Sequence, residues 1–378
     1  MKRYPGKIAM LEETAVFMEQ VAALVKECKD TLLKEKEVAE YWNRVNDIKE
    51  AYWEKAYNGI SGKKTELDSE KLAEVMELFH EIVETGIRKA CALEDGICPT
   101  YFSFDVTEYE DDAEGILPKH FAVKNIPLFL EGPVRYLKLD NSMDVKKKLY
   151  ESVKNSNLYD SKLSMYKVNA SLKDASYEIG RCKAFTPGWL ENESIWLHME
   201  YKYLLEVLKS GLYKEFIDDF HKAAIPFLDP EVYGRSIYEN SSFIASSDNP
   251  NEKIHGKGFV ARLSGSTVEF IHMWSIMMFG EKPFEMKDGK LSLSFAPIMP
   301  AYLIGEDKQI EVMFLGHTPV VYQFADQKDY IPGNYEVTGM ELTFADGRVV
   351  KVDGAVLAEN EAAAVRGGEV KKMVVSVK

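Results

Sequence analysis

Three long stretches in the first quarter of the chain place apolar residues at three- and four-residue spacing, with Glu and Lys between them. This spacing lines up one face of an α-helix, so the pattern predicts three helices. The predicted helices cover Met10–Leu33, Glu37–Tyr57 and Ser69–Ala92. Two glycines within Gly59–Lys64 separate the second helix from the third.

The period shortens to two residues further on. Tyr101–Tyr109 alternates apolar and polar residues and predicts a strand, which an acidic turn at Glu110–Glu114 follows. From this turn to Pro133, prolines and a glycine predict an irregular segment, either a substrate-facing loop or a packed connector. Helical spacing then returns in four stretches: Asp144–Val153, Glu191–Leu208, Tyr213–Ala224 and Ser266–Phe279.

After Pro283 the pattern becomes a series of short alternating runs bounded by Asp-Gly or Pro-Gly pairs. These runs predict strands at Leu291–Phe295, Ile310–Leu315, Val320–Phe324, Glu336–Phe344 and Val349–Val352. About 90 residues of this kind suit a small β-sandwich or jelly roll. The predicted fold is therefore mainly α plus a β domain, with a helical region over residues 1–285 and a C-terminal β domain over residues 286–378.

The amino-acid composition and net charge limit the kinds of molecule that the chain can bind. The 378 residues are 46% apolar and 29% charged, which is ordinary for a folded globular chain. Acidic residues number 61 and basic residues 47, so the net charge of −14 repels nucleic acid and anionic lipid. A small anion such as phosphate can still bind where local donors converge, because a pocket of N–H groups can oppose the overall field.

The sequence lacks the motifs that predict a metal site, a signal peptide or a membrane-spanning segment. The four cysteines show no Cys-x-x-Cys pair, and the histidines form no His-Glu-x-x-His set, so we predict no metal site. The N-terminal residues lack the apolar core of a signal peptide, and the longest apolar stretch, Ile271–Phe279, is too short to cross a bilayer. These features predict a cytoplasmic protein without a membrane partner.

The densest group of unusual residues lies between Phe185 and Trp274. Its first segment, 185–198, opens with a Pro-Gly turn and predicts a helix start capped by Asn192 or Ser194, with His198 nearby. A helix start beside a histidine suits an anion. The alternative is that the tryptophans and His198 of this segment are buried core residues.

Two further segments carry polar groups of the same kind. Residues 233–243 supply hydroxyl, amide and charged groups that suit sugar or phosphate oxygens, or that serve a solvated loop. Residues 255–267 run into the predicted helix at Ser266, where small residues let backbone N–H groups approach a phosphate, although an ordinary Ser/Thr cap looks the same. The spacing of a nucleotide P-loop is absent, so ATP binding is not indicated. Carboxylates near aromatic residues could act on sugars, but spacing singles none out: Asp105, Glu108, Glu191, Glu193 and Glu239.

Several short motifs occur in order: LENESIWLH at 190–198, FIA at 243–245, HG at 255–256, LSGS at 263–266 and FAPIMP at 295–300. Together they resemble the cellobiose phosphorylase group, glycoside hydrolase family 94, most of all its long cellobiose and 1,2-β-oligoglucan phosphorylases. The resemblance covers most of Phe185–Pro300 and the earlier helices only loosely.

The resemblance implies an (α/α)6 barrel in which inorganic phosphate attacks the anomeric carbon of a β-glucoside. An aspartic acid protonates the leaving oxygen, and α-glucose 1-phosphate forms with inversion. His198 takes the position of a phosphate-binding histidine, and Ser264 with Gly265 matches a Thr-Gly pair that also contacts phosphate. Phosphate is then a co-substrate, and no other cofactor is expected. The candidate substrate contacts are Trp196, Arg235, Glu239 and Ser242. Of these, Ser242 falls near a glutamine that supports the site in the family.

Two departures shape the prediction. The family's general acid lies in an Asp-Trp-Asn-like stretch, and this sequence contains no Asp-Trp pair. The barrel needs about twelve helices, whereas the pattern predicts roughly seven or eight. We therefore expect the C-terminal part of a larger phosphorylase, which supplies the phosphate half of the site. Its partners would be a β-glucan or β-disaccharide, phosphate, and an upstream phosphorylase segment or a second copy of the chain.

Two alternatives remain open. The chain could be a glycoside hydrolase on a related toroid, with Asp105 or Glu108 as the acid and water as the nucleophile. It could also be a non-catalytic subunit that binds carbohydrate or serves assembly.

Overall fold

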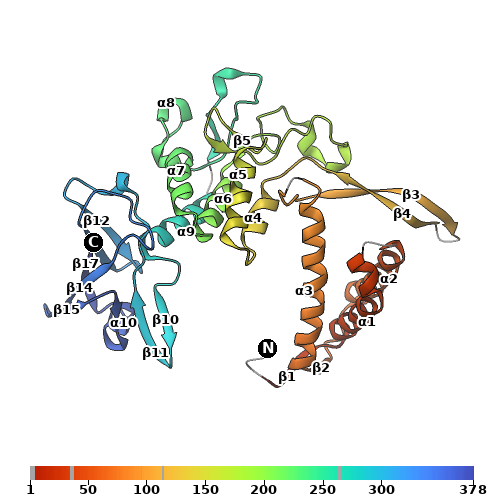
Figure 1. The fold of residues 1–378 in the computed structure, drawn as a ribbon, viewed down its shortest axis with the longest axis horizontal. Helices are drawn as coiled ribbons and strands as arrows, with labels where there is room; N and C mark the ends of the chain where they lie inside the picture. The colour runs from red at the N-terminus through yellow and green to blue at the C-terminus, as the bar shows by residue number, and fades with distance from the viewer. Residues whose placement is uncertain (1–4, 35–37, 95, 113–114, 262–264) are drawn as a thin grey trace. The chain divides into compact units, whose positions relative to one another are not determined.

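The structure is a computed structural model that describes residues 5–34, 38–94, 96–112, 115–261 and 265–378. It divides into two compact units, Met1–Gly132 (unit 1) and Pro133–Lys378 (unit 2). The described residues form ten α-helices and several small sheets (Figure 1). The predicted combination of helices and strands is thus confirmed.

The three predicted N-terminal helices are confirmed in unit 1. They are α1 (Glu12–Lys34), α2 (Val38–Asn58) and α3 (Ser69–Cys91), and α1 packs against both others. Asp68 accepts a hydrogen bond from the Glu70 N–H at 2.8 Å, which caps the start of α3. Just before α3, strand β2 (Lys64–Asp68) pairs with β1 (Lys7–Leu11) in an antiparallel ribbon.

A long antiparallel hairpin follows in unit 1. Its strands are β3 (Phe102–Asp112) and β4 (Gly115–Asn125). Strand β3 confirms the predicted strand. The expectation of an irregular segment after the acidic turn is wrong over β4. The predicted acidic turn begins inside β3, and its residues 113–114 lie outside the described residues. Pro118 is tolerated in β4 because its partner Tyr109 lies at a register shift and each strand of a two-stranded ribbon has an unpaired edge.

The helices of unit 2 are centred on α6. This helix (Leu197–Lys209) packs against α7 (Tyr213–Ala223) and α9 (Gly265–Phe279), and nine of its residues are buried. The remaining helices before the C-terminal sheets are α4 (Glu131–Leu137), which begins in unit 1, α5 (Met143–Lys154) and the short α8 (Pro230–Tyr233).

The predicted start of a helix at Glu191 is wrong, because α6 begins at Leu197. The two residues expected to cap it are used in the preceding turn. Asn192 Nδ2 donates to the Phe185 carbonyl at 2.8 Å, and Ser194 Oγ donates to the Leu190 carbonyl. Trp196 is the N-cap residue of α6, and its side chain accepts no hydrogen bond from the first N–H groups of the helix.

The C-terminal part of unit 2 contains a five-stranded sheet of order β12-β13-β17-β14-β15. Only β13 and β17 pair in parallel; the other neighbours are antiparallel. The bounds are β12 (Gln309–Phe314), β13 (Thr318–Phe324), β14 (Val337–Phe344), β15 (Val349–Asp353) and β17 (Val370–Val377). A three-stranded sheet joins β10 (Phe284–Lys287), β11 (Lys290–Ser294) and β16 (Val356–Leu357), and α10 (Glu359–Arg366) precedes β17.

A buried tyrosine joins this sheet to the helices of unit 2. Tyr322 on β13 is fully buried, and its hydroxyl donates to the Met278 carbonyl near the end of α9 at 2.6 Å. The bond satisfies a carbonyl that the helix end leaves without an intrahelical partner. The strands predicted within residues 291–352 are confirmed, whereas β10, β16, β17 and α10 were not predicted.

Candidate functional site

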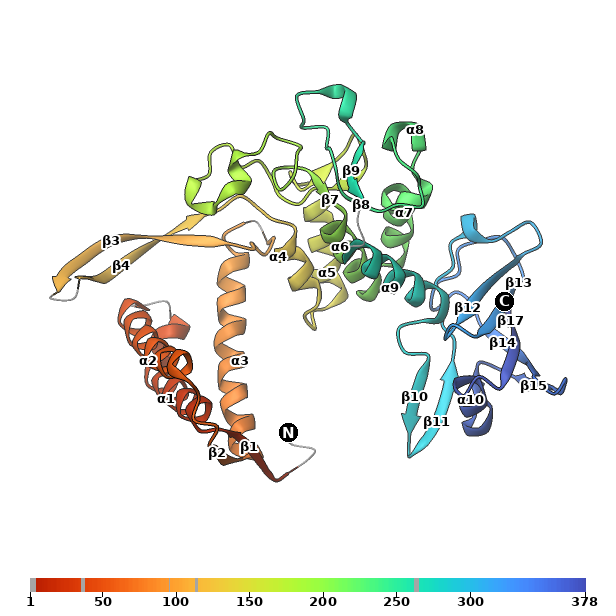
Figure 2. The same ribbon diagram turned by 180° about the vertical axis from the view of Figure 1, so that it is seen from behind.

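A three-stranded antiparallel sheet brings together the three segments that the sequence singles out. Its strands are β7 (Ile195–Trp196), β8 (Ser241–Ile244) and β9 (Gly258–Ala261), with β8 in the middle. Strand β7 runs directly into α6, and β9 precedes α9 in the chain (Figure 2). The two outer strands, β7 and β9, precede α6 and α9 in the chain, and these two helices pack against each other.

Aromatic side chains hold this sheet together. Trp196 and Phe243 face each other in the register, and their rings stack with centroids 6.1 Å apart. The ring of Trp189 contacts Phe243 and Phe259 edge-on, at 5.0 and 4.5 Å. The indole N–H of Trp196 donates to the Leu190 carbonyl at 2.6 Å. Trp196 therefore has a packing role, and its role as a substrate contact stays a prediction.

His198 lies in the first turn of α6 and touches the start of α9. A Cβ atom added to Gly265, the first residue of α9, would overlap the imidazole ring of His198. Only a residue without a side chain lets the ring approach this helix start so closely. The structure thus brings together two of the three predicted phosphate contacts, His198 and Gly265. The third, Ser264, lies outside the described residues.

Charged residues on α6 and α9 shift the pKa of the His198 imidazole. Burial and the positive charge of Lys202, one turn along α6, lower the pKa of His198, while Glu269 on α9 raises it. The Glu269 Oε1 atom lies 3.7 Å from His198 Nε2. The side chain of His198 is 40% exposed, so a ligand can reach it. With its pKa lowered, the ring is neutral at pH 7 and can donate one hydrogen bond.

Asn240 ties the first turn of α9 to α6. Its Nδ2 donates to Thr267 Oγ1 at 3.3 Å, and its Oδ1 lies 3.5 Å from the hydroxyl of Tyr201 on α6. The Tyr201 hydroxyl, in turn, accepts a bond from the Ile225 N–H at 3.1 Å. These bonds fix the two helix starts relative to each other. The sequence did not reveal Asn240 and Glu269, because contacts between separate elements do not show in the spacing along the chain. It did offer a signal for Lys202, which follows His198 by four residues on one helix face.

The turn that leads into β7 is strained and strongly held. Leu190 and Glu193 both adopt left-handed backbone angles, with φ of 50° and 56°. Such angles are unfavourable for residues with a side chain and persist only where the surroundings enforce them. Buried Asn169 does so from outside the turn: its Oδ1 accepts from the Glu193 N–H and its Nδ2 donates to the Glu191 carbonyl, both at 2.6 Å.

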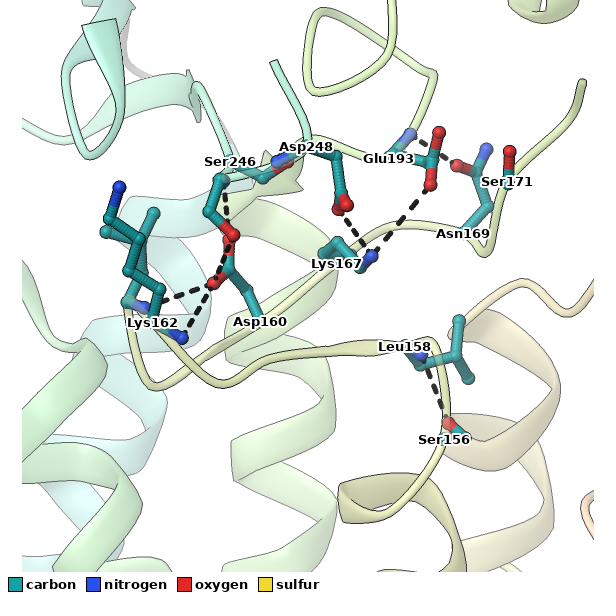
Figure 3. A network of polar contacts seen from close by, with 12 residues as sticks. Ser156, Leu158, Asp160, Lys162, Lys167, Asn169, Ser171, Glu193, Ser246 and Asp248 are labelled. Atoms are coloured by element: carbon teal, nitrogen blue, oxygen red, sulfur yellow. Dashed lines mark hydrogen bonds and ion pairs between the residues drawn. The ribbon is translucent and has the colours of Figure 1, made fainter. Parts of the chain in front are cut away.

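A buried lysine lies between two carboxylates beside this turn (Figure 3). Lys167 Nζ is 2.6 Å from Asp248 Oδ2 and 4.0 Å from Glu193 Oε1. Burial raises the pKa of Glu193, as does the charge of Asp248, while Lys167 and a hydrogen bond from Ser171 oppose the change. The cluster joins the turn to the segment after β8.

The other predicted site residues have local partners. Arg235 and Glu239 form an ion pair at 3.1 Å, and Ser242 Oγ donates to the Val260 carbonyl on β9 at 2.9 Å. The acids of the hydrolase alternative, Asp105 and Glu108, are exposed on β3 in unit 1, and Lys124 lies 3.7 Å from Asp105.

Metal ions and membranes are two other kinds of partner that the described residues can be assessed for. Within them, no group of three or more His, Cys, Asp or Glu side chains is placed to hold a metal ion. Across the same residues, no helix combines the length and the apolar character needed to cross a membrane.

Comparison with known proteins finds no matching family model and no matching curated protein. The functional interpretation therefore depends on the site geometry and on the motif resemblance.

Proposed function

We propose that this chain supplies the phosphate-binding half of the site of an inverting β-glucoside phosphorylase, with His198 and Gly265 at the phosphate. One observation carries the proposal: the imidazole of His198 lies against the start of α9 at Gly265. The imidazole of His198, the start of α9 with its backbone N–H groups and the charge of Lys202 then lie near one another. In a chain of net charge −14, this is a local set of donors for a small anion.

The proposed chemistry needs only such donors and one acid. Phosphate is already an anionic nucleophile at neutral pH, so the site must align it rather than deprotonate it. A phosphate oxygen forms a bond to the anomeric carbon while the bond to the leaving oxygen breaks and that oxygen receives a proton. The product is α-glucose 1-phosphate with inverted configuration. The proposal assigns the proton donor to a polypeptide segment outside this sequence.

We also propose a place for these helices and sheets in the phosphorylase fold. Helices α6, α7 and α9 would be later helices of an (α/α)6 barrel, and residues 286–378 its C-terminal β domain. The packing of α6 against both α7 and α9 supports this arrangement.

Phosphate binding by the full chain tests the proposal. Titration calorimetry with inorganic phosphate should detect binding to the unaltered chain and a loss of affinity of about tenfold or more in His198→Ala, because a directed donor is removed. His272→Ala, which alters an exposed histidine on the same α9, is the matched control and should bind as the unaltered chain does. Absence of phosphate binding, or equal binding by His198→Ala, would contradict the proposal.

Turnover distinguishes the alternatives. With a β-linked glucose disaccharide and phosphate, the chain alone should bind phosphate without forming α-glucose 1-phosphate at rates usual for enzymes. Rapid formation would show that the acid lies within this chain. Release of glucose without phosphate, abolished in Asp105→Asn or Glu108→Gln, would establish the hydrolase instead.

A further inference from the structure

Two of the four cysteines lie close together at the end of α3. Cys91 is the last residue of that helix, and Cys98 follows it after a tight reversal of the chain. Two backbone hydrogen bonds make the reversal: Gly96 N–H donates to the Cys91 carbonyl at 3.1 Å, and Ile97 N–H donates to the Glu94 carbonyl at 2.8 Å. The path of the backbone therefore returns Cys98 to the end of the helix that carries Cys91.

The two thiols touch. A side-chain hydrogen bond joins Cys98 to Cys91, and Cys98 Sγ also lies 3.8 Å from the Pro99 carbonyl. Both cysteines are reduced and partly exposed. The other two cysteines are placed differently. Cys182 Sγ donates to the Ile179 carbonyl at 3.5 Å, and Cys28 lies on α1 near Arg44.

The backbone around Cys98 is held in place. A Cβ atom added to Gly132 would overlap the Cys98 carbonyl, so the two backbones are in direct contact. Thr100 Oγ1 accepts from the Gly132 N–H at 2.7 Å and donates to the Phe129 carbonyl at 2.9 Å. Ile97, beside Cys98, is buried. The backbone at Cys98 therefore cannot move without breaking these contacts.

We propose that Cys91 and Cys98 are a reversible redox pair, which a hydroperoxide closes to a disulfide and a dithiol reductant reopens. This modification site is independent of the proposed phosphate site. It lies in unit 1, whereas His198 and Gly265 lie in unit 2.

The reaction balances with hydrogen peroxide as the oxidant. The Cys91 thiolate attacks one peroxide oxygen, the O–O bond breaks, and Cys91 becomes a sulfenic acid while hydroxide leaves. The Cys98 sulfur then attacks the Cys91 sulfur, the S–O bond breaks, and the oxygen departs as water after taking the Cys98 proton. In sum, two thiols and one peroxide give one disulfide and two waters.

The surroundings of Cys98 assign the two roles. The hydrogen bond with Cys91 and burial both raise the pKa of Cys98, so Cys98 is a thiol that resists ionisation. A thiolate is the attacking species in such oxidations, which makes Cys91 the attacking residue and Cys98 the resolving residue.

The test is to treat the full chain with hydrogen peroxide, block remaining thiols with N-ethylmaleimide and digest it with a protease that cuts after Glu94. That cut falls between the two cysteines, so a disulfide holds two otherwise separate peptides together. We expect the linked peptides in mass spectra, with Cys28 and Cys182 alkylated, and we expect dithiothreitol to separate them. Cys91→Ser and Cys98→Ser should each abolish the linked species.

Two results would overturn the proposal. One is full alkylation of Cys91 and Cys98 after a peroxide dose that oxidises Cys182. The other is a link from Cys91 to Cys28, or sulfinic acid at Cys91 with Cys98 still reduced. Because the unaltered chain gives the decisive spectrum, misfolding of a variant cannot hide the answer.

Discussion

At Gly265, the lack of a side chain decides whether an imidazole can touch the start of a helix. Most helix starts tolerate alanine well, since it has the highest helix propensity. Here the added methyl group would occupy the space of the His198 ring. Local propensity and the tertiary contact therefore favour different residues, which is typical of a site selected for a function.

We predict that Gly265→Ala displaces His198. It should weaken phosphate binding by about tenfold or more and destabilise unit 2 by about 1–3 kcal/mol, as overpacking does. Titration calorimetry and urea unfolding measure the two effects. Gly86→Ala is the matched control, because Gly86 is helical in α3 and open space surrounds it. It should stabilise the chain by about 0.5–1 kcal/mol and leave phosphate binding unchanged. Unchanged binding in Gly265→Ala would contradict the assigned contact.

A second residue-scale feature is the fully buried carboxyl of Glu200 on α6. Its Oε1 accepts from the Tyr166 N–H at 2.8 Å, and its Oε2 has no hydrogen-bond partner. Burial raises the pKa of Glu200 well above its ordinary 4.5, and the charges of Asp219 and Asp160 add to this, although the Tyr166 bond opposes it. The folded chain therefore holds this proton to a higher pH than the unfolded chain does.

We predict that Glu200→Gln is more stable than the unaltered chain at pH 7. The unfolded chain releases the Glu200 proton above pH 4.5 while the folded chain holds it, so the stability of the unaltered chain falls as pH rises through that window. The difference in the free energy of unfolding between Glu200→Gln and the unaltered chain should grow by up to about 1.4 kcal/mol per pH unit above pH 4.5 and vanish below pH 4.5. Urea unfolding at several pH values measures it. Glu231→Gln, at an exposed position, should show no such trend. A difference independent of pH would contradict the explanation.

At the scale of elements, one buried carboxylate joins two segments far apart in the sequence. Asp160 ends the short strand β5 (Tyr159–Asp160), and its Oδ1 accepts from the Lys162 and Leu163 N–H groups, both at 3.1 Å (Figure 3). It also accepts from the Ser247 hydroxyl at 2.9 Å and from the Ser247 N–H at 2.7 Å. One side chain thus shapes the turn after β5 and holds the segment after β8.

We predict that Asp160→Ala lowers the free energy of unfolding by about 3 kcal/mol or more, since it leaves several donors without an acceptor. The urea midpoint should fall accordingly. Asp174→Ala removes an exposed carboxylate from the same unit and should change stability by about 0.5 kcal/mol or less. A small effect of Asp160→Ala would show that water replaces the carboxylate at these donors.

The elements also show what the sequence can and cannot predict. Helices α1, α2 and α3 follow from periodicity alone, because each carries apolar residues at three- and four-residue spacing along the sequence. The start of α6 does not, because its apparent caps bond to the preceding turn instead of the helix. For β17, buried Met373, Val375 and Val377 alternate with less buried residues, which is an ordinary strand signal, and only the strand's central, parallel position needs tertiary information. The pairing of His198 with Gly265 was expected from motif resemblance, whereas the roles of Glu269 and Asn240 arise from packing.

For the whole molecule, the division into two compact units has a thermodynamic consequence. Each unit has buried apolar residues of its own, such as Leu72 on α3 in unit 1 and Leu204 on α6 in unit 2. Chains built this way depart from a single all-or-none transition.

We predict two unfolding transitions in scanning calorimetry. Leu72→Ala should lower one transition and Leu204→Ala the other, since removing a buried leucine side chain costs about 2–5 kcal/mol within its own unit. The exposed Leu139 provides the control, and Leu139→Ala should leave both transitions in place. One transition that both buried variants shift equally would show that the units unfold together.

The central place of β17 sets the order in which the chain can acquire its structure during synthesis. Until residues 370–377 emerge from the ribosome, β12 and β13 form one hairpin and β14 and β15 another, and each leaves bare the edge that β17 later fills. Nascent chains stalled before this point should therefore carry two unjoined hairpins with exposed backbone, which makes them natural clients for chaperones that shield strand edges.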